Sequence, residues 1–438
     1  MTVRLHLQML IVVLVVTGCD VPVRDLDTGG IALAGAGGWG SQAVDEAGAG
    51  GASRAEPACA HGFAVVSSDY QSSNVSLLDP TGEVLSASFI SSGSTTAGLS
   101  ASLSGDVVLP TRSTRAGRLA LIDRSPASVL TWVDLRSGEV EAQLSVATGF
   151  DSNPHDYVEL SPSKAYVLRF DENLASGREP FDGGNDVLVV DPTAPAITGR
   201  IDLAPAMAGV ASRFVAHPDR AARVRDRVVV VLGVYRTDLL ETAPSRLVVI
   251  DPLADAIVQT VVLDGYHACS SLAVSPDEDE LAVACAGEWG GDDRPDIDTS
   301  GLVRLRVADQ LEIVHRHRAI DFGQGPIAFG LDYASRRYLL LTTYGQFDGR
   351  GEPAADDTLI ELDLETNESR GVLRSAGKPF TLGDVRCDST CGVCVVTDAE
   401  RQGGVVHRLT VEHGGVSEPT AIRVDDEIGL PPRCLAEF

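Results

Sequence analysis

The chain has 438 residues, of which 62 are Asp or Glu and 35 are Lys or Arg, so its formal net charge at pH 7 is −27. A surface with this excess of carboxylates repels phosphate backbones and anionic headgroups, which argues against nucleic acid as a partner. The length would suit two or three average domains, or one large repeat architecture.

Residues 1–18 have the layout of a signal peptide. Positive charge at the amino terminus and Arg4 precedes an apolar run, residues 9–16, that is too short to span a bilayer. The following Val16-Thr17-Gly18-Cys19 resembles a bacterial lipobox, and the resemblance implies cleavage before Cys19 and lipidation of its thiol. Several acyl chains on one residue would hold the protein at a membrane of the bacterial cell envelope, facing the periplasm or the cell surface. An ordinary cleaved signal peptide is the alternative.

Residues 19–57 comprise this cysteine and a Gly- and Ala-rich stretch. Such a composition cannot bury enough apolar surface to fold, so we expect a disordered tether. A flexible coil of this length spans roughly 30–35 Å, enough to hold a globular domain away from the bilayer. The folded domain would then comprise residues 58–438.

A hydrophobic–Asp–turn–hydrophobic hairpin recurs through this domain every 47–60 residues. Its seven copies are centred on Asp79, Asp134, Asp191, Asp251, Arg306, Asp363 and Thr410. A second hairpin, such as SLAVSPDEDELAV near residue 275, lies between successive copies. A long fixed period of strands without helical pattern is the signature of a radial or solenoid repeat. We therefore predict an all-β fold, a seven-bladed β-propeller with four-stranded antiparallel blades, in which the Asp carboxylates cap the turns.

One repeat also carries a family resemblance. The combination of SPDEDELAV (275–283) or SPSKAYVLR (161–169) with VVIDPLADAIVQTVVL (248–263) resembles the YVTN-type, YncE-like propeller repeat. The likeness covers residues 60–438 and implies the architecture, not a function. The literal tetrapeptide is absent, and Tyr166-Val167-Leu168-Arg169 is the nearest match.

The two ends of the domain predict how the ring closes. The first strand, expected at residues 62–67, has no hairpin partner ahead of it, and residues 430–438 follow the last hairpin with no strand after them. The C-terminus should therefore supply the innermost strand of the blade that the N-terminus begins.

Seven cysteines remain besides Cys19, and an exported chain can oxidise them. Cys269 and Cys285 flank one turn almost symmetrically, as do Cys387 and Cys394, and Cys59 and Cys434 lie on the two strands expected to close the ring. We expect these three pairs as disulfides, with Cys391 left over or competing. The spacing Cys387-x3-Cys391-x2-Cys394 also fits an iron–sulfur loop or a zinc site, but a hairpin of an exported protein favours disulfides.

Four long acidic loops should open on one face of the ring, where loops of this length usually carry function. They are residues 171–186, 236–245, 288–299 and 346–357. In the third loop, Asp292, Asp293, Asp296 and Asp298 could offer oxygens to Ca²⁺, although no EF-hand order is present. A solvated loop without metal is the alternative.

His155 and His267 are expected in loops near the mouth of the central channel, where a lactonase-type propeller would hold a metal. The chain has no G-x-S-x-G elbow, H-E-x-x-H helix or G-x-x-x-x-G-K loop, so we assign no catalytic residue. The sequence favours a binding or scaffold module whose acidic loop face contacts a protein, peptide or glycan of the envelope. A metal-assisted lactonase-type hydrolase is the rival, and structural Ca²⁺ in the loops is a third possibility.

Overall fold

The computed structural model describes residues 62–438, except 113, 115, 116, 289–295, 324, 349, 401–403 and 426. The predicted signal peptide, the lipidation site Cys19, the tether, Cys59, Asp292 and Asp293 lie outside the described residues. Across the described part of the chain, no helix has the length and apolar character needed to cross a membrane.

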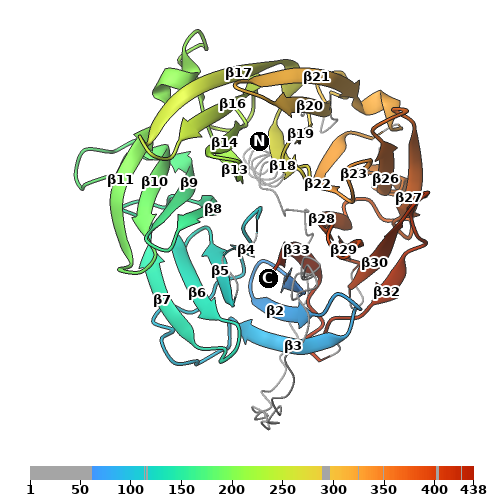
Figure 1. Ribbon diagram of the computed structural model, residues 1–438. Helices are drawn as coiled ribbons and strands as arrows, with labels where there is room; N and C mark the ends of the chain where they lie inside the picture. Colours follow the sequence, from blue (N-terminus) through green and yellow to red (C-terminus); the bar gives the residue numbers. More distant parts are fainter. Residues whose placement is uncertain are drawn as a thin grey trace, which may run out of the picture.

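Seven antiparallel sheets surround a central channel, which confirms the predicted β-propeller (Figure 1). Each sheet runs outward from an inner strand at the channel. From inside to outside, blade 1 comprises β33 (Pro432–Glu437), β1 (Phe63–Ser68), β2 (Ser73–Leu78) and β3 (Val84–Ser91), and blade 2 comprises β4 (Val107–Val108), β5 (Arg118–Asp123), β6 (Val129–Asp134) and β7 (Val140–Ser145). Blade 3 comprises β8 (Pro154–Ser161), β9 (Lys164–Glu172), β10 (Gly184–Asp191) and β11 (Ala196–Asp202). Blade 4 comprises β13 (Pro218–Val224), β14 (Arg227–Leu232), β16 (Pro244–Asp251) and β17 (Ala256–His267).

The remaining blades follow the same order. Blade 5 comprises β18 (Cys269–Val274), β19 (Glu280–Cys285), β20 (Gly301–Val307) and β21 (Leu311–Arg318). Blade 6 comprises β22 (Ile327–Tyr333), β23 (Tyr338–Thr343), β26 (Thr358–Asp363) and β27 (Ser369–Arg374). Blade 7 comprises β28 (Leu382–Asp388), β29 (Val393–Asp398) and β30 (Val405–Glu412), and both β31 (Gly415–Val416) and β32 (Thr420–Ile422) pair with β30. Two small strand pairs lie outside the blades, β12 (Phe214–Val215) with β15 (Tyr235–Arg236) and β24 (Gln346–Phe347) with β25 (Pro353–Ala355). Two 3₁₀ turns, η1 (Ala204–Met207) and η2 (Ala319–Asp321), precede blades 4 and 6.

The hydrophobic pattern of each strand reflects its place in the blade. β14 reads RVVVVL and is almost wholly buried, because neighbouring blades cover both faces of the inner strands. The outer strand β11 instead alternates between exposed and half-buried residues, since only one of its faces meets a neighbouring blade.

The ring closes as predicted, because β33 pairs antiparallel with β1 over Phe63↔Glu437 to Ser67↔Pro432. The N-terminal and C-terminal ends of the domain are thereby joined within one sheet.

The repeated aspartates hold the turns between the third and fourth strands. Each Oδ1 accepts the backbone N–H two residues further on at 2.8–3.0 Å: Asp79 from Thr81, Asp134 from Arg136, Asp191 from Thr193, Asp251 from Leu253 and Asp363 from Glu365. This confirms the predicted capping role. We call the end of the ring that carries these turns the turn face, and the opposite end the loop face.

A second set of aspartates joins neighbouring inner strands. Three carboxylates, two buried and one half-buried (Asp332), accept a backbone N–H of the next blade: Asp156 from Ala221 at 2.7 Å, Asp332 from Cys387 at 2.9 Å and Asp384 from Leu435 at 3.0 Å. Between blades 6 and 7 the backbones also approach closely, because a Cβ on Gly330 would lie 2.3 Å from the carbonyl oxygen of Gly383. Such bonds fix the inner strands around the channel.

Two predicted disulfides are present in the hairpins, Cys269–Cys285 and Cys387–Cys394. Cys434 is also disulfide-bonded, but the predicted partner Cys59 lies outside the described residues. The expectation that Cys391 is left over is wrong, because every described cysteine is oxidised. Since Cys387 and Cys394 are joined to each other, the triplet offers neither an iron–sulfur cluster nor zinc a set of thiolates.

Candidate functional site

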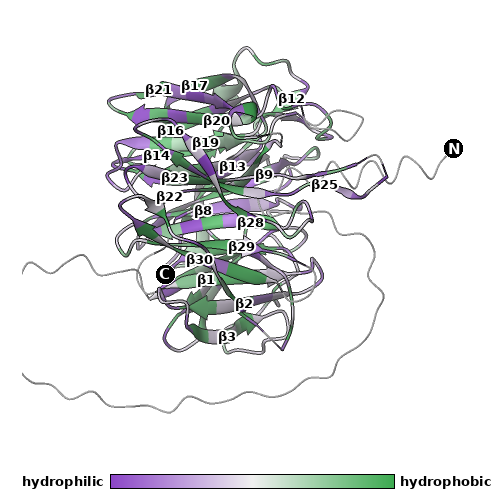
Figure 2. Cartoon of the chain, turned by 90° about the vertical axis from the view of Figure 1, so that its right-hand side faces the viewer, coloured by the Kyte–Doolittle hydropathy of each residue, from purple (hydrophilic) through white to green (hydrophobic). Residues whose placement is uncertain are grey.

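The loop face is uneven, because the long connections between second and third strands belong to four consecutive blades. They are residues 173–183, 233–243, 286–300 and 344–357, whereas the equivalent loops of blades 1, 2 and 7 are 69–72, 124–128 and 399–404. β12 and β25, which belong to the two extra strand pairs, lie on the same side of the ring (Figure 2). Blades 3, 4 and 6, together with the described ends of the blade 5 loop (286–288 and 296–300), therefore build a raised crescent on this face.

Part of the acidic charge in the crescent is structural. Asp182 accepts the backbone N–H groups of Gly177, Arg178 and Glu179 at 2.7–3.0 Å, and these bonds, that from Gly177 first, lower the pKa of its carboxyl. Asp348 similarly accepts N–H groups within its own hairpin. These carboxylates shape their loops.

Asp357 joins the crescent to the ring. It is fully buried and accepts the N–H groups of Gly345, Phe380, Thr381 and Leu382 at 2.6–3.0 Å. Burial raises the pKa of this carboxyl, although the four backbone donors oppose that effect. One side chain thus fixes the loop of blade 6 to the start of blade 7.

The rest of the crescent presents charge and apolar side chains together. Its four loops contain 13 Asp or Glu and four Arg, a formal net charge of −9. Four large hydrophobic residues project from the loop face, the first three from blades 3, 4 and 6 and the last from η2: Leu174 (80% exposed), Leu240 (47%), Phe347 (49%) and Ile320 (61%). Exposed apolar residues inside a charged surround are typical of an interaction surface.

An aromatic series links this face to the channel. Phe347 stacks on Phe380 with ring centroids 6.0 Å apart, Phe380 contacts Tyr344 at 5.1 Å, and Tyr344 meets Phe329 of the inner strand β22 at 6.4 Å. The β24–β25 hairpin is therefore linked to the inner strand β22 through Phe380 and Tyr344.

The two candidate histidines lie at different blade junctions. His155 is the second residue of the inner strand β8, not of a loop, and is 1% exposed. Its Nδ1 lies 3.2 Å from Oδ1 of Asp219 on β13, and its ring stacks on Phe170 at 4.1 Å. Burial lowers the pKa of His155 well below its usual value and raises the pKa of Asp219 to about 7. Among the described residues, the other ring nitrogen of His155 has no hydrogen-bond partner.

His217 also contacts Phe170, in a tilted arrangement with ring centroids 4.4 Å apart. Its Nδ1 is 2.9 Å from the carbonyl oxygen of Phe170, and burial lowers its pKa to about 3. No sequence pattern singles out this third histidine, because Phe170 lies 47 residues away in the chain.

His267 ends the outer strand β17, and its Nδ1 lies 2.8 Å from Oγ1 of Thr242 and 3.7 Å from Glu288. Of the predicted Ca²⁺ ligands, Asp296 accepts a hydrogen bond on its side-chain carboxylate from the backbone N–H of Asp298. Within the described residues, no three His, Cys, Asp or Glu side chains converge as a metal site. His155 on the inner strand of blade 3 and His267 at the end of the outer strand of blade 4 are not brought together.

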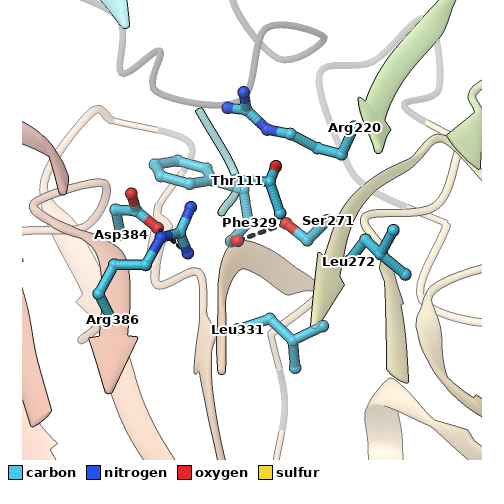
Figure 3. Close-up of a pocket in the computed structure, with 8 residues that line it drawn as sticks. All are labelled: Thr111, Arg220, Ser271, Leu272, Phe329, Leu331, Asp384 and Arg386. Carbon is cyan, nitrogen blue, oxygen red and sulfur yellow. Dashed lines mark hydrogen bonds and ion pairs between the residues drawn. The ribbon is translucent and has the colours of Figure 1, made fainter. Parts of the chain in front are cut away.

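Sequence reasoning missed a small polar pocket in the channel, with room for about one water molecule. Five inner segments line it, through residues that include Thr111, Arg220, Ser271, Phe329, Asp384 and Arg386 (Figure 3). Arg386 pairs with Asp384 at 3.0 Å, and Arg220 donates to the carbonyl oxygen of His155 at 2.9 Å. The available signal was the presence of charged residues inside the inner-strand runs PDRAARV and LGDVRCD.

Comparison with known proteins identifies the fold. No protein-family model and no curated protein matches the sequence. Among solved structures, a protein from Lactobacillus plantarum is 11% identical with a TM-score of 0.55, covering 86% of this chain and 98% of that one. The periplasmic gluconolactonase PpgL of Pseudomonas aeruginosa is 12% identical with a TM-score of 0.53, covering 85% and 98%.

A third similar structure is the β-propeller domain of Cps50 (Swd1) from Myceliophteria thermophila, 11% identical with a TM-score of 0.51, covering 78% of this chain and 95% of that one. The chain has a β-propeller fold. At such low identity these likenesses establish the architecture alone, since propellers host many functions.

Proposed function

We propose that this chain is a lipid-anchored β-propeller of the bacterial cell envelope that binds a protein, peptide or glycan through its loop face. The observation that carries the proposal is the crescent, in which the acidic loops of blades 3, 4 and 6 and the η2 turn after blade 5 carry exposed apolar side chains. The apolar tips would anchor a partner and the carboxylates would attract its basic rim, which mainly raises the association rate.

The location in the envelope is supported by the lipobox-like Val16-Thr17-Gly18-Cys19 and by the two hairpin disulfides, since such bonds persist in oxidising compartments. The similar fold from Pseudomonas aeruginosa is described as periplasmic. Recovery of the protein from membranes with an acylated Cys19 would test the anchor, and an unmodified Cys19 in cytosolic protein would contradict it.

The loop face is tested by neutralising equal numbers of exposed carboxylates on the two faces. One variant replaces four loop-face residues with amides: Glu172, Glu179, Asp298 and Glu352. The matched control replaces four on the turn face: Glu139, Glu365, Glu368 and Glu412. Partners captured from envelope extracts by the wild type should associate about tenfold more slowly with the first variant at low salt, and unchanged with the control. Equal effects of the two variants would remove the loop face as the binding surface.

Hydrolysis of a lactone is the second candidate function, favoured by the buried His155–Asp219 pair beside the channel. A neutral imidazole oriented by a carboxyl is suited to accept a proton, and PpgL is described as a gluconolactonase. Turnover of gluconolactone that His155→Gln abolishes and a chelator also stops would support the metal-assisted form. No turnover of a lactone and ester panel would eliminate it.

A further inference from the structure

The chain contains two copies of the Asn-x-Ser/Thr motif, which is the acceptor pattern for N-linked glycans in exported proteins. They are Asn74-Val75-Ser76 in β2 and Asn367-Glu368-Ser369 where β26 turns into β27. The first copy is closed to an enzyme, because Asn74 is 0% exposed. Its Nδ2 donates to the carbonyl oxygen of Ala87 at 2.8 Å and to the Asp425 carboxylate at 3.3 Å.

The second copy lies at the tip of a hairpin on the turn face. Residues 365–369 are all exposed, at the outer rim of blade 6 where β26 and β27 join (Figure 1). Asp363 shapes this tip, because its Oδ1 accepts the N–H of Glu365 at 2.9 Å and its carbonyl oxygen accepts the N–H of Asn367 at 2.8 Å. Asn367 has a φ of +59°, a turn conformation that asparagine tolerates well. The motif is therefore displayed on a defined turn that faces solvent.

The side-chain amide of Asn367 is held at its oxygen and open at its nitrogen. Oδ1 accepts a hydrogen bond from Nη1 of Arg304 at 3.3 Å, whereas the described residues offer its Nδ2 no acceptor. Arg304 is held mainly by Glu280, through two bonds of 2.7 and 3.0 Å. The nitrogen that would carry a sugar thus has no competing partner in the described chain.

A carboxylate two positions before the asparagine completes the bacterial form of this motif, Asp/Glu-x-Asn-x-Ser/Thr. Glu365 occupies that position before Asn367, whereas Ser72 occupies it before Asn74. The Glu365 side chain is 67% exposed and pairs with Arg337 at 3.2 Å. Because a surface pair of this kind contributes at most about 1 kcal/mol, a basic group of an enzyme can take the place of Arg337.

We propose that Asn367 carries an N-linked oligosaccharide. The inference rests on the proposed envelope location, since the donor is an oligosaccharide joined to a polyprenyl diphosphate in the membrane that the exported chain crosses. In the transfer, Nδ2 of Asn367 bonds to C1 of the first sugar, and the bond between C1 and the diphosphate oxygen breaks. Polyprenyl diphosphate leaves with that electron pair, and Nδ2 gives one proton to a base of the transferase. The glycan extends from the turn face and leaves the loop face free.

Mass spectrometry of the protein purified from the envelope of the cells that produce it tests the inference. The tryptic peptide of residues 351–370 should carry an oligosaccharide, and the peptide of residues 55–112, which contains Asn74, should carry none. Asn367→Gln and Ser369→Ala should abolish the mass increment, whereas Ser369→Thr should retain it because the motif accepts either hydroxyl. Glu365→Gln should lower the modified fraction severalfold. The matched control is Glu368→Gln, which neutralises an exposed carboxylate at the variable position and should leave that fraction unchanged.

An unmodified peptide 351–370, or a sugar that persists on it in Asn367→Gln, would overturn the inference. The same spectra report the state of Cys19, so the two proposals can fail separately. A bare Asn367 in protein with an acylated Cys19 would remove the glycan and leave the envelope location standing, whereas cytosolic protein that carries neither modification would contradict both. Partner capture by Asn367→Gln should match the wild type, because the substitution lies on the turn face.

Discussion

The turn face and the loop face are built by the same seven blades yet differ in almost every respect. At the turn face five aspartates make the same short-range bond to the backbone two residues later. At the loop face the connections differ in length, and the buried carboxylate of Asp357 accepts hydrogen bonds from backbone N–H groups of two blades. Repetition therefore dominates the turn face, where five of the seven blades share this bond, and the largest variation in length lies on the loop face.

The strongest test of this contrast is Asp357→Ala, because one truncation leaves four N–H groups, two buried and two partly buried, without their acceptor. The expected loss in the free energy of unfolding is about 4 kcal/mol, measured by urea denaturation. Asp356→Ala, at the half-exposed neighbour, is the control and should cost under about 0.5 kcal/mol. A small effect at Asp357 would mean that the crescent is not fixed by this carboxylate.

Cys269–Cys285 joins the loop-face end of the β18–β19 hairpin, opposite its turn. Replacing both cysteines with serine should destabilise the protein by about 3 kcal/mol, since the disulfide closes a chain segment with a sequence separation of 16 residues. Replacing Cys387 and Cys394, separated by 7 residues, should cost less. The reverse order, measured by thermal unfolding without reductant, would show that loop length does not govern these contributions.

The buried Asp219 at the loop-face end of β13 predicts a pH dependence. Its folded pKa, raised by burial to about 7, exceeds that of an unfolded aspartate, 3.8, so the native protein binds this proton more tightly. Its contribution to stability is thus fully present below the unfolded pKa of 3.8, falls progressively as the pH rises, and is lost once the pH has passed about 7. Relative to Asp219→Asn, the wild type should lose about 2 kcal/mol between pH 5 and pH 6.5. A difference that is constant over this range would contradict the assignment.

The turn face should respond least. Asp79→Ala removes an acceptor for two N–H groups and the Thr81 hydroxyl in a solvent-accessible turn, where water can replace it. The expected loss is about 1 kcal/mol, and Asp79→Asn should cost less because the amide keeps one acceptor oxygen. Denaturation of both variants measures these losses in the free energy of unfolding. A loss for Asp79→Ala as large as that for Asp357→Ala would contradict the expected difference between the two faces.

The features predictable from the sequence are those made by nearby residues. Asp79 and Thr81 are two positions apart, and the Cys269–Cys285 pairing follows from one hairpin, so local patterns indicate both. The closure of β33 on β1 was also predictable, because each end of the repeat array lacked one strand.

The channel could not be predicted in the same way. Asp219 meets His155 across 64 residues, and Arg386 shares a pocket with Thr111 from a distant blade. Which inner-strand charges face one another depends on how far each strand is shifted along the axis, and register shifts occur in β8, β13, β18 and β28. A periodic sequence pattern does not encode those shifts.

The most direct test places the same photo-crosslinking amino acid at exposed leucines on opposite faces, Leu174 of the crescent and Leu253 in a turn. Leu174 is 80% exposed and Leu253 94%, so neither substitution should affect folding. Irradiation of living cells should give a discrete adduct from position 174 and none from position 253. An adduct from position 253 alone, or the same adducts from both positions, would contradict recognition by the loop face.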